Sequence, residues 1–473
     1  MHEECGVFGV YNTEEMNVAD EIYAALFALQ HRGQLSCGIA VNCGEGNVRC
    51  KRGNGLVSEV LTQDKIDELA EGGRAISGIG HVRYAPHEMA HRENAQPLVM
   101  HYARGTLTVA NNGCLVNAVP LRRELEEQGA VFQTGSDAEL IGYLTARERL
   151  KTDTIEQALV NVMSRLSGAY SLVMLSPQKL IAARDPQGFR PLCIGKLGES
   201  YVVASESCAI TSIGGTIVRD VAPGEVVIIG SLGLQSLQTH CQKKSALCVF
   251  EYVYFARPDS IVDGVCVHTA RKRAGACLAK EHPVDADVVM GVPDSGIDAA
   301  IGCAMATGIP YKTGFIKNRY IGRTFIQQTQ SQRVREVGIK LNPVRSVVEG
   351  KRVILIDDSI VRGTTCAQIV AKLREAGAKE IHMRISSPPF LHPCYFGTDI
   401  KSRDDLIACR LSQEEIRAHI GADSLGFLSL SGLHSIAAES GASFCDACFT
   451  GQYPIEIPQE SCADKYETKL GTL

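Results

Sequence analysis

The first half of the chain contains short apolar runs that are rich in β-branched residues and broken by glycine. Such runs occupy residues 171–176, 201–205 and 225–230, with the sequences SLVMLS, YVVAS and EVVIIG, and their length is typical of buried strands. Apolar residues with helical spacing occur at 21–30 and 138–150. The pattern predicts a first domain of stacked sheets flanked by helices.

The pattern changes after a polar stretch at residues 232–247, which contains no strong element of its own. Strand-like runs and helical segments then alternate, at 287–296, 298–308, 309–316, 351–359 and 366–377. Alternating strands and helices predict a parallel sheet with crossover helices. We therefore expect a first domain over residues 5–235 and a second over residues 236–473.

Composition narrows the class of protein. The 473 residues exceed what one ordinary core holds, and 45% of them are hydrophobic, as in a globular chain of two domains. The 48 Lys and Arg against 53 Asp and Glu give a net charge of −5, which argues against a binder of nucleic acid or of anionic membranes. There is no secretion signal pattern and no apolar run long enough to span a bilayer, so the predicted location is the cytoplasm.

The sequence VILIDDSIVRGTTC at residues 353–366 is the sharpest motif of the second half. Its apolar residues predict a buried strand that ends at Asp357 and Asp358, and a Gly/Thr loop then opens a helix. Backbone N–H groups of residues 362–365 and the hydroxyls of the two threonines can bind a phosphate at the helix N-terminus. The carboxylates would repel that phosphate, so we expect them to bind ribose hydroxyls or a metal ion. An ordinary capped loop is the alternative.

This motif resembles the phosphoribosyl diphosphate (PRPP) motif of type I phosphoribosyltransferases. The resemblance implies that the paired acids hold the ribose hydroxyls together with Mg²⁺, and that the loop holds the 5′-phosphate. The residues implied to bind PRPP are Asp357, Asp358, Ser359, Arg362, Gly363, Thr364 and Thr365. A second turn, GVPDSG at 291–296, resembles the pyrophosphate-binding loop and makes Ser295 a candidate Mg²⁺ ligand beside Asp357 and Asp358, although generic turn chemistry would explain it nearly as well.

A polar, basic segment lies between these two motifs, over residues 317–345. Its cations include Arg319, Arg323, Arg333, Arg335 and Lys340. Beside a highly charged anionic substrate we expect a lid that neutralises the leaving pyrophosphate, with Arg323 and Lys340 in contact with PRPP. A solvated surface is the alternative.

Cys5 raises a separate question, because a thiol at this place can be a small buried hydrophobe or a nucleophile. Five segments, CGVFGVYN, ALQHRGQLSCGI, GIGHVRYAP, NNGCLVN and TGSDAELIGYL, occur in an order that resembles N-terminal-nucleophile (Ntn) glutamine amidotransferases. The two resemblances imply a two-domain fold, α+β and α/β: an Ntn-hydrolase αββα sandwich, then a type I phosphoribosyltransferase domain with a parallel sheet.

The two sets of motifs together, from Cys5 to about residue 457, resemble the glutamine phosphoribosyldiphosphate amidotransferase family. The resemblance implies an enzyme that hydrolyses glutamine and transfers the ammonia to PRPP, giving 5-phosphoribosylamine, glutamate and pyrophosphate in the first step of purine synthesis. It also implies feedback inhibition by purine nucleotides and a homotetramer. Two alternatives stay open, namely a PRPP-binding regulator and another Ntn-type amidotransferase with weakened use of glutamine.

The resemblance also implies roles for single residues of the glutamine site. Cys5 is the nucleophile, and its own α-amino group, with a pKa of about 8 when free, is the base. Residues 1–4 are then a propeptide that must be removed. The other implied residues are Asn112 and Gly113 as oxyanion donors, Arg83 and Asp137 as partners of the α-carboxylate and α-ammonium of glutamine, and Arg32 and Gly33 as further parts of the pocket.

Each of these residues has a plainer alternative. Arg83 could form a surface ion pair, Asp137 could cap a helix after Ser136, and the Asn-Gly pair could be a hairpin turn. The chain also departs from the family pattern, which we expect to change pocket polarity and glutamine affinity. The departures are Leu35, Ala85 with Pro86, Asn111 and Cys114.

Most of the eighteen cysteines are expected to be reduced and to serve as small hydrophobes. The pair Cys445 and Cys448, with Cys248 and Cys394 as remote partners, could surround an iron–sulfur cube or a tetrahedral zinc ion, and spacing alone does not choose between them. The flanking sequences resemble the cluster-bearing branch of the family. That resemblance implies a 4Fe-4S cluster that fixes the C-terminal segment to the transferase domain.

Overall fold

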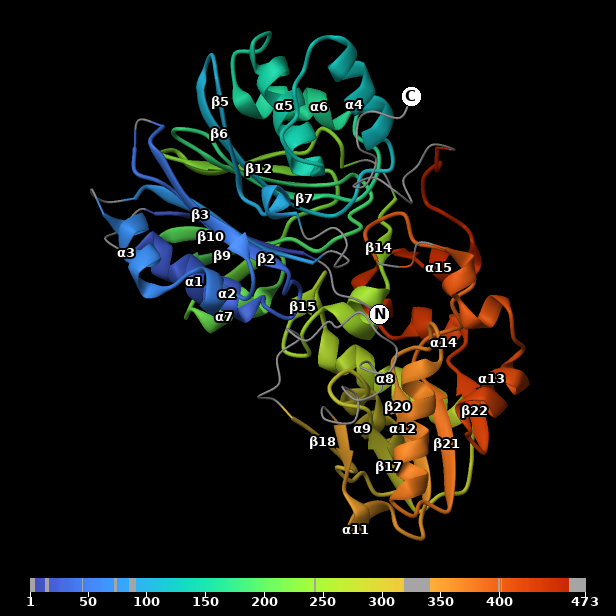
Figure 1. Ribbon diagram of the computed structural model, residues 1–473. Helices are drawn as coiled ribbons and strands as arrows, with labels where there is room; N and C mark the ends of the chain where they lie inside the picture. The colour runs from blue at the N-terminus through green and yellow to red at the C-terminus, as the bar shows by residue number, and fades with distance from the viewer. Residues whose placement is uncertain are drawn as a thin grey trace.

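The computed structural model describes residues 5–12, 17–44, 46–71, 75–84, 91–241, 244–318, 341–398, 400 and 402–458. Figure 1 shows two bodies, one formed by the first half of the chain in blue and green, the other by the second half in yellow to red. No helix within these described ranges is long and apolar enough to cross a membrane.

Seven antiparallel strands form the first sheet of the N-terminal body. Their order is β11 (Thr216–Asp220), β9 (Cys193–Leu197), β10 (Ser200–Ala204), β1 (Gly6–Tyr11), β4 (Ser77–Arg83), β2 (Ser36–Asn42) and β3 (Val48–Asn54). Helices cover its outer face, namely α1 (Val18–Ala28), α2 (Val57–Val60), α3 (Gln63–Ala70) and α7 (Ser207–Ser212) (Figure 1). The α1 helix begins at the Asn17 cap and buries one apolar face that includes Ile22 and Leu26.

Six antiparallel strands form the second sheet. Their order is β13 (Gly233–Leu237), β12 (Val226–Gly230), β8 (Leu180–Arg184), β7 (Ser171–Leu175), β6 (Gly105–Asn112) and β5 (Leu98–Tyr102). The helices α4 (Ala118–Glu127), α5 (Asp137–Arg149) and α6 (Ile155–Met163) cover its outer face. Buried side chains of both sheets, such as Val7 and Val173, fill the space between them. The predicted αββα sandwich is therefore confirmed. The prediction that residues 232–247 hold no strong element is wrong, because β13 lies there and pairs with β12, so the predicted boundary after residue 235 falls within a strand.

Four parallel strands form the sheet of the second body, and the parallel sheet predicted from the alternating pattern is confirmed. Their order is β17 (Val288–Gly291), β20 (Arg352–Asp357), β21 (Glu380–Ile385) and β22 (Ser424–Phe427). Helices of this body are α8 (Val267–Glu281), α9 (Gly296–Thr307), α11 (Arg345–Val348), α12 (Thr364–Glu375), α13 (Gln413–Ile420) and α14 (Leu430–Ser435). The strand residues 353–356 are all buried, as expected for a strand covered on both faces.

The predicted strand at 309–316 is shorter than its sequence pattern. Tyr311 forms only an isolated bridge with Val289, and β18 begins at Phe315. Pro310 has no N–H to donate, which limits the hydrogen bonds that this segment can form with β17. The short strand β18 (Phe315–Lys317) instead pairs with β19 (Leu341–Pro343).

Short elements join the two bodies. The strand β14 (Leu247–Cys248) pairs in parallel with β23 (Phe444–Cys445), so the C-terminal segment returns to the start of the second body. The remaining pieces at this junction are a π-helical turn (Glu251–Phe255), the hairpin of β15 (Ile261–Val262) and β16 (Val265–Cys266), and α15 (Ala447–Thr450). Apolar side chains of both bodies, including Phe189 and Phe396 with stacked rings 4.2 Å apart, pack together here.

Candidate functional site

The β20 strand brings two adjacent carboxylates to the carboxyl edge of the parallel sheet. It is apolar and buried over residues 353–356 and ends at Asp357. Gly363 precedes α12 with φ +80°, and a Cβ at this residue would lie 2.7 Å from Cδ1 of Ile407. Glycine takes this left-handed conformation without strain, so the loop can turn sharply into the helix.

The first turn of α12 faces solvent. Arg362, Thr364 and Thr365 are exposed, and the helix they introduce is 12 residues long. The first N–H groups of such a helix have no partner within it and carry a partial positive charge. Nη2 of Arg362 lies 3.0 Å from Oδ1 of Asp405, which keeps a cation beside this turn. The arrangement can bind a phosphate group.

The two carboxylates behind this turn are each 7% exposed. The N–H of Asp358 donates to Oδ1 of Asp357 at 3.0 Å. Burial, and then repulsion by the carboxylate of Asp358, raises the pKa of Asp357 well above its usual range. Ser295 at the start of α9 donates from Oγ to Oδ2 of Asp358 at 2.5 Å, and Ser359 donates to the other oxygen of the same carboxylate. The structure thus brings together the three predicted Mg²⁺ ligands, whose oxygens are of the type that Mg²⁺ prefers.

One described cation lies at the turn before Ser295. Nζ of Lys317 donates to Oδ2 of Asp294 at 2.5 Å, so the end of β18 contacts the predicted pyrophosphate loop. The cations on which the lid prediction rests, Arg319, Arg323, Arg333, Arg335 and Lys340, lie outside the described residues.

Cys5 lies directly before β1, at one end of the sandwich. Its neighbour Gly6 is opposite Val82 of β4, and its thiol donates to the carbonyl of Tyr84 with a sulfur–oxygen distance of 3.7 Å. Arg83, the last residue of β4, is 5% exposed. The structure therefore brings Cys5 and Arg83 to the same edge of the first sheet.

A buried histidine links this edge to the second sheet. Nε2 of His81 in β4 donates to the carbonyl of Asn111 in β6 at 3.0 Å. Burial lowers the pKa of His81 to about 3, so the ring is neutral. The N–H of Asn111 donates to Oε1 of Gln96 at 2.7 Å, which fixes the end of β6 from its other side. Asn112 follows directly and thus lies at the Cys5 end of the sandwich.

Asn112 and Gly113 have features of a binding site for an oxyanion. No described residue forms a hydrogen bond with the side chain of Asn112, although that side chain is completely buried. A buried amide without a partner is rare and calls for a functional explanation. Gly113 has φ +138°, and a Cβ there would lie 2.2 Å from the carbonyl oxygen of Ala169. Only glycine fits this turn, which directs the backbone past the Asn112 side chain.

Asp137 is the first residue of α5, and the capping role belongs to Ser136, whose hydroxyl accepts from the N–H of Ala138. Oδ2 of Asp137 accepts from the N–H of Leu115 at 2.8 Å, and the residue is 4% exposed. Asp137 therefore fixes the segment that follows Gly113, which places its carboxylate beside the predicted oxyanion site.

Arg32 lies behind Cys5, with its side chain completely buried. Its Nε donates to the carbonyl of Cys5 at 2.9 Å, and its Nη atoms donate to Glu206 and Glu251 at 2.6–2.9 Å. Burial alone would lower the pKa of Arg32, but Glu251 and Glu206 raise it well above its usual value. Gly33 packs against the backbone of β4. Arg32 and Gly33 therefore lie directly beside Cys5 and β4, and their part in the glutamine pocket stays a prediction.

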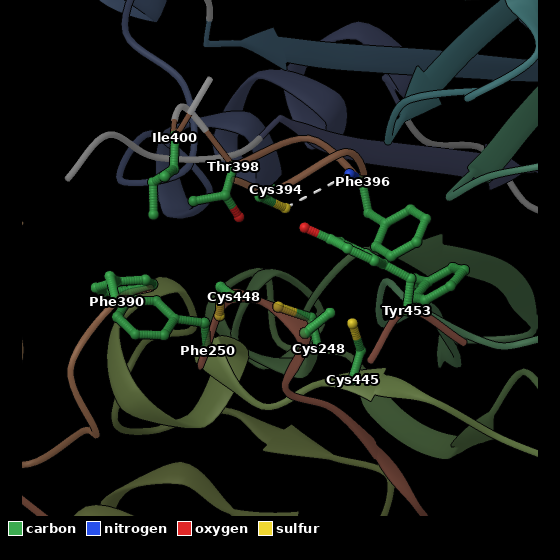
Figure 2. A pocket seen from close by; sticks show the side chains of 12 residues that line it. Cys248, Phe250, Phe390, Cys394, Phe396, Thr398, Ile400, Cys445, Cys448 and Tyr453 are labelled. Atoms are coloured by element: carbon green, nitrogen blue, oxygen red, sulfur yellow. Dashed lines mark hydrogen bonds between the residues drawn. The ribbon is translucent and has the colours of Figure 1, made fainter. Parts of the chain in front are cut away.

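Four cysteines surround one space at the junction of the two bodies. Figure 2 shows the side chains of Cys248, Cys394, Cys445 and Cys448 around a common cavity. The other lining residues are Phe189, Phe250, Phe390, Phe396, Thr398, Ile400, Ala447 and Tyr453. Burial and the three other cysteines raise the pKa of Cys448 well above its usual value. In the described part of the chain, no group of three or more His, Cys, Asp or Glu side chains has the arrangement to hold a metal ion.

Comparisons with known proteins decide the family. Residues 81–212 match a glutamine amidotransferase domain, and residues 268–386 match a phosphoribosyl transferase domain. The chain is 48% identical over 460 residues to the amidophosphoribosyltransferase of Archaeoglobus fulgidus, an overlap that covers 97% of this chain and 99% of that protein. The chain belongs to the amidophosphoribosyltransferase family.

A second relative and a solved structure from the same family support this assignment. The amidophosphoribosyltransferase of Bacillus subtilis is 49% identical over 467 residues, covering 98% of this chain and 96% of the relative. A solved structure of the glutamine PRPP amidotransferase from that organism, complexed with ADP and GMP, superimposes with a TM-score of 0.90 at 48% identity and covers 97% of this chain and 99% of the other. The predicted family, two-domain fold and enzyme class are confirmed: the family members are pentosyltransferases that use glutamine to aminate PRPP in purine synthesis.

The sequence did not indicate three buried residues that lie behind the predicted glutamine site of this amidophosphoribosyltransferase, namely His81, Glu206 and Glu251. Glu251 carries a signal in hindsight, because it is the lone acid in the apolar run LCVFEYVYF and a buried carboxylate requires a partner. Its partner Arg32 is 219 residues away in the chain, so no local pattern could identify the pair.

Proposed function

We propose that this amidophosphoribosyltransferase hydrolyses glutamine at Cys5 and passes the ammonia inside the protein to C1 of PRPP bound at the carboxyl edge of β20. The observation that carries the proposal is the presence of two chemically different sites in one chain. One end of the sandwich holds a thiol beside a buried amide without a described partner, and the parallel sheet holds a buried acid pair beside an open helix N-terminus.

In the glutamine site, the α-amino group of Cys5 takes the thiol proton as the sulfur bonds to the amide carbon of glutamine. The same amino group returns the proton to the amide nitrogen as the C–N bond breaks, which releases ammonia. Water then hydrolyses the thioester, which gives glutamate and restores the thiol. That amino group exists only after removal of residues 1–4, because the nitrogen of Cys5 is otherwise part of an amide. The side chain of Asn112 and the N–H of Gly113 stabilise the oxyanion. Arg83 and Asp137 bind the α-carboxylate and α-ammonium groups of glutamine.

In the PRPP site, the first turn of α12 binds the 5′-phosphate through Arg362, Gly363, Thr364 and Thr365. Asp357 and Asp358 hold the ribose hydroxyls, and Ser359 orients Asp358 through its hydrogen bond. Mg²⁺, when held by Ser295 and the two aspartates, supplies positive charge that offsets their repulsion and that of the pyrophosphate. Arg323 and Lys340 remain proposed contacts of PRPP from outside the described residues.

The four thiols around the junction cavity fit a 4Fe-4S cluster. Cysteine sulfur is the usual ligand of such clusters, and most of the other residues that line the cavity are aromatic or aliphatic. A tetrahedral zinc ion held by the same four thiols is the alternative. Bound at Cys248, Cys394, Cys445 and Cys448, the cluster supplies structural cross-linking rather than electron transfer.

The remaining proposals concern partners and organisation. Purine nucleotides are proposed as feedback inhibitors, in keeping with the Bacillus subtilis structure that was complexed with ADP and GMP. A homotetramer in the cytoplasm, with a glutaminase domain at about residues 5–235, is proposed from the family resemblance. A PRPP-binding regulator and another Ntn-type amidotransferase are the alternatives, and they are disfavoured because Asn112, Gly113 and the acid pair are all present.

The experiment that tests the proposal separates the two sites. Cys5→Ala should lose all glutamate formation from glutamine, because the nucleophile is gone, and should still convert PRPP with free ammonia at raised pH. Wild-type protein should form glutamate in a PRPP- and Mg²⁺-dependent manner. Glutamate formation by Cys5→Ala would contradict the role of Cys5, and binding of PRPP without turnover of either nitrogen source would favour the regulator.

A further inference from the structure

A buried network of ion pairs crosses the junction between the two domains directly behind Cys5. Its centre is Arg32, whose guanidinium lies between Glu206 of the sandwich and Glu251 of the transferase half. All three side chains have no exposed surface. If one of these side chains moves, water therefore cannot solvate the charge that has lost its partner.

Arg32 is also in direct contact with the backbone of the proposed nucleophile. Its Nε donates to the carbonyl of Cys5 at 2.9 Å, and that carbonyl belongs to the residue before the first strand of the fold. Cys5 lies outside the strand, and sheet pairing does not hold it in place. The hydrogen bond from Arg32 therefore helps set the direction of its thiol and its nitrogen.

Glu251 holds Arg32 in the position that this contact requires. Its two carboxylate oxygens accept from Nη1 and Nη2 of Arg32, both at 2.9 Å, in a bidentate pair. The same carboxylate lies 3.4 Å from Nη1 of Arg190, whose Nη2 donates to the carbonyl of Phe396 at 2.8 Å. Phe396 in turn donates from its N–H to the sulfur of Cys394. Glu251 is thus linked through Arg190 and Phe396 to the cysteine-lined cavity.

We propose that Glu251 is a positioning residue for glutamine hydrolysis, which acts through Arg32 on Cys5, so that the transferase domain completes the glutaminase site. The inference rests on the proposed role of Cys5 as nucleophile. It gives a physical reason why the two activities are joined in one chain: the nucleophile is oriented only when the second domain is correctly packed against the first.

The test compares variants of Glu251 in the full-length protein. Glu251→Gln keeps the shape and removes the charge, and Glu251→Asp keeps the charge but withdraws it from Arg32. Since small misplacements of a reacting group cost about 100-fold in rate, we expect kcat for glutamine to fall by about that factor in Glu251→Gln and by less in Glu251→Asp. The KM for glutamine and the ammonia-dependent rate should stay near their wild-type values, because neither depends on the direction of the Cys5 thiol.

A second ion pair between the domains provides the control. Arg184 of β8 pairs with Asp263 of the β15–β16 turn at 2.8 Å, and neither residue contacts Cys5 in any described hydrogen bond. Asp263→Asn should lower the thermal stability without changing the ratio of glutamine-dependent to ammonia-dependent activity. A purely structural role of Glu251 would give the same result as this control.

The outcomes distinguish the inference from the proposed function. If Cys5→Ala still hydrolyses glutamine, the proposed function fails. If Cys5→Ala is inactive with glutamine while both Glu251 variants keep the wild-type activity ratio, only the positioning role of Glu251 is overturned. If Glu251→Gln does not fold, the ratio measured for Glu251→Asp decides the question.

Discussion

The two proposed substrate sites differ in how the chain builds them. The PRPP site comes almost entirely from one strand, one loop and one helix N-terminus over residues 353–366, with Ser295 added from the neighbouring strand-to-helix turn. The glutamine site needs the ends of three strands, the start of α5 and a buried carboxylate from the other domain. The residues of the PRPP site are held in place mainly by one loop and its neighbouring strand and helix. The residues of the glutamine site are held in place by the packing of the whole junction between the domains.

The two sites also differ in their exposure to water. The first turn of α12 is open to solvent, as a site for a large and highly charged substrate requires. The residues that support Cys5 are buried, and their charges are paired with one another. Removal of one partner from a buried pair typically costs about 3–5 kcal/mol, so the glutamine site should be sensitive to changes that lie far from glutamine itself.

The largest expected effect comes from the acid pair. The double substitution of Asp357→Asn with Asp358→Asn removes the charges proposed to hold the ribose and Mg²⁺, so glutamine- and ammonia-dependent formation of 5-phosphoribosylamine should both fall by about 1,000-fold or more. Pyrophosphate release measures both reactions. Labelling of Cys5 by an alkylating agent should be unchanged, because the thiol lies in the other domain.

Asp287 provides the control for this prediction. It lies at the opposite edge of the same sheet, where its carboxylate accepts from Nη2 of Arg352 at 3.0 Å. Asp287→Asn should leave both rates near wild type. Equal losses in Asp287→Asn would show that the sheet, and not the carboxyl edge, was disturbed.

The contrast between the sites explains how far the sequence could be interpreted. The PRPP motif was visible because its residues are contiguous, and the structure places Asp357, Asp358 and Ser295 together as the motif predicts. The glutamine residues could be assigned only by family resemblance, since Cys5 and Asn112 are far apart in sequence and belong to different sheets. Glu206 has no periodic or local signature. Glu251 stands out only as a lone acid in an apolar run, and nothing local identifies its partner Arg32, 219 residues away.

The second prediction concerns the cavity between the domains. Cys448→Ser should lose iron and acid-labile sulfide from anaerobically purified protein, and the yield of soluble protein should fall, because one ligand of the proposed cross-link is missing. Elemental and sulfide analysis with a thermal melt measures this. Cys277→Ser, which changes a thiol that contacts only the Ser435 hydroxyl among the described hydrogen bonds, should keep both. Stoichiometric zinc without sulfide in the wild-type protein would contradict the cluster.

The smallest expected effect separates binding of glutamine from its hydrolysis. Asp137→Asn keeps the side chain's size and its acceptor for the N–H of Leu115, but it removes the negative charge proposed to bind the α-ammonium of glutamine. A charged hydrogen bond of this kind contributes about 1.5–3 kcal/mol, so KM for glutamine should rise by about 10- to 100-fold, with a smaller change in kcat. Steady-state kinetics at saturating PRPP measures both constants.

Glu139→Gln is the matched control on the same helix, since Glu139 is also buried but accepts from Gln133 and Thr134, away from Cys5. It should reduce stability and leave KM unchanged. A KM shift of similar size in both variants would mean that α5 as a whole was displaced, and the role of Asp137 in glutamine binding would be wrong.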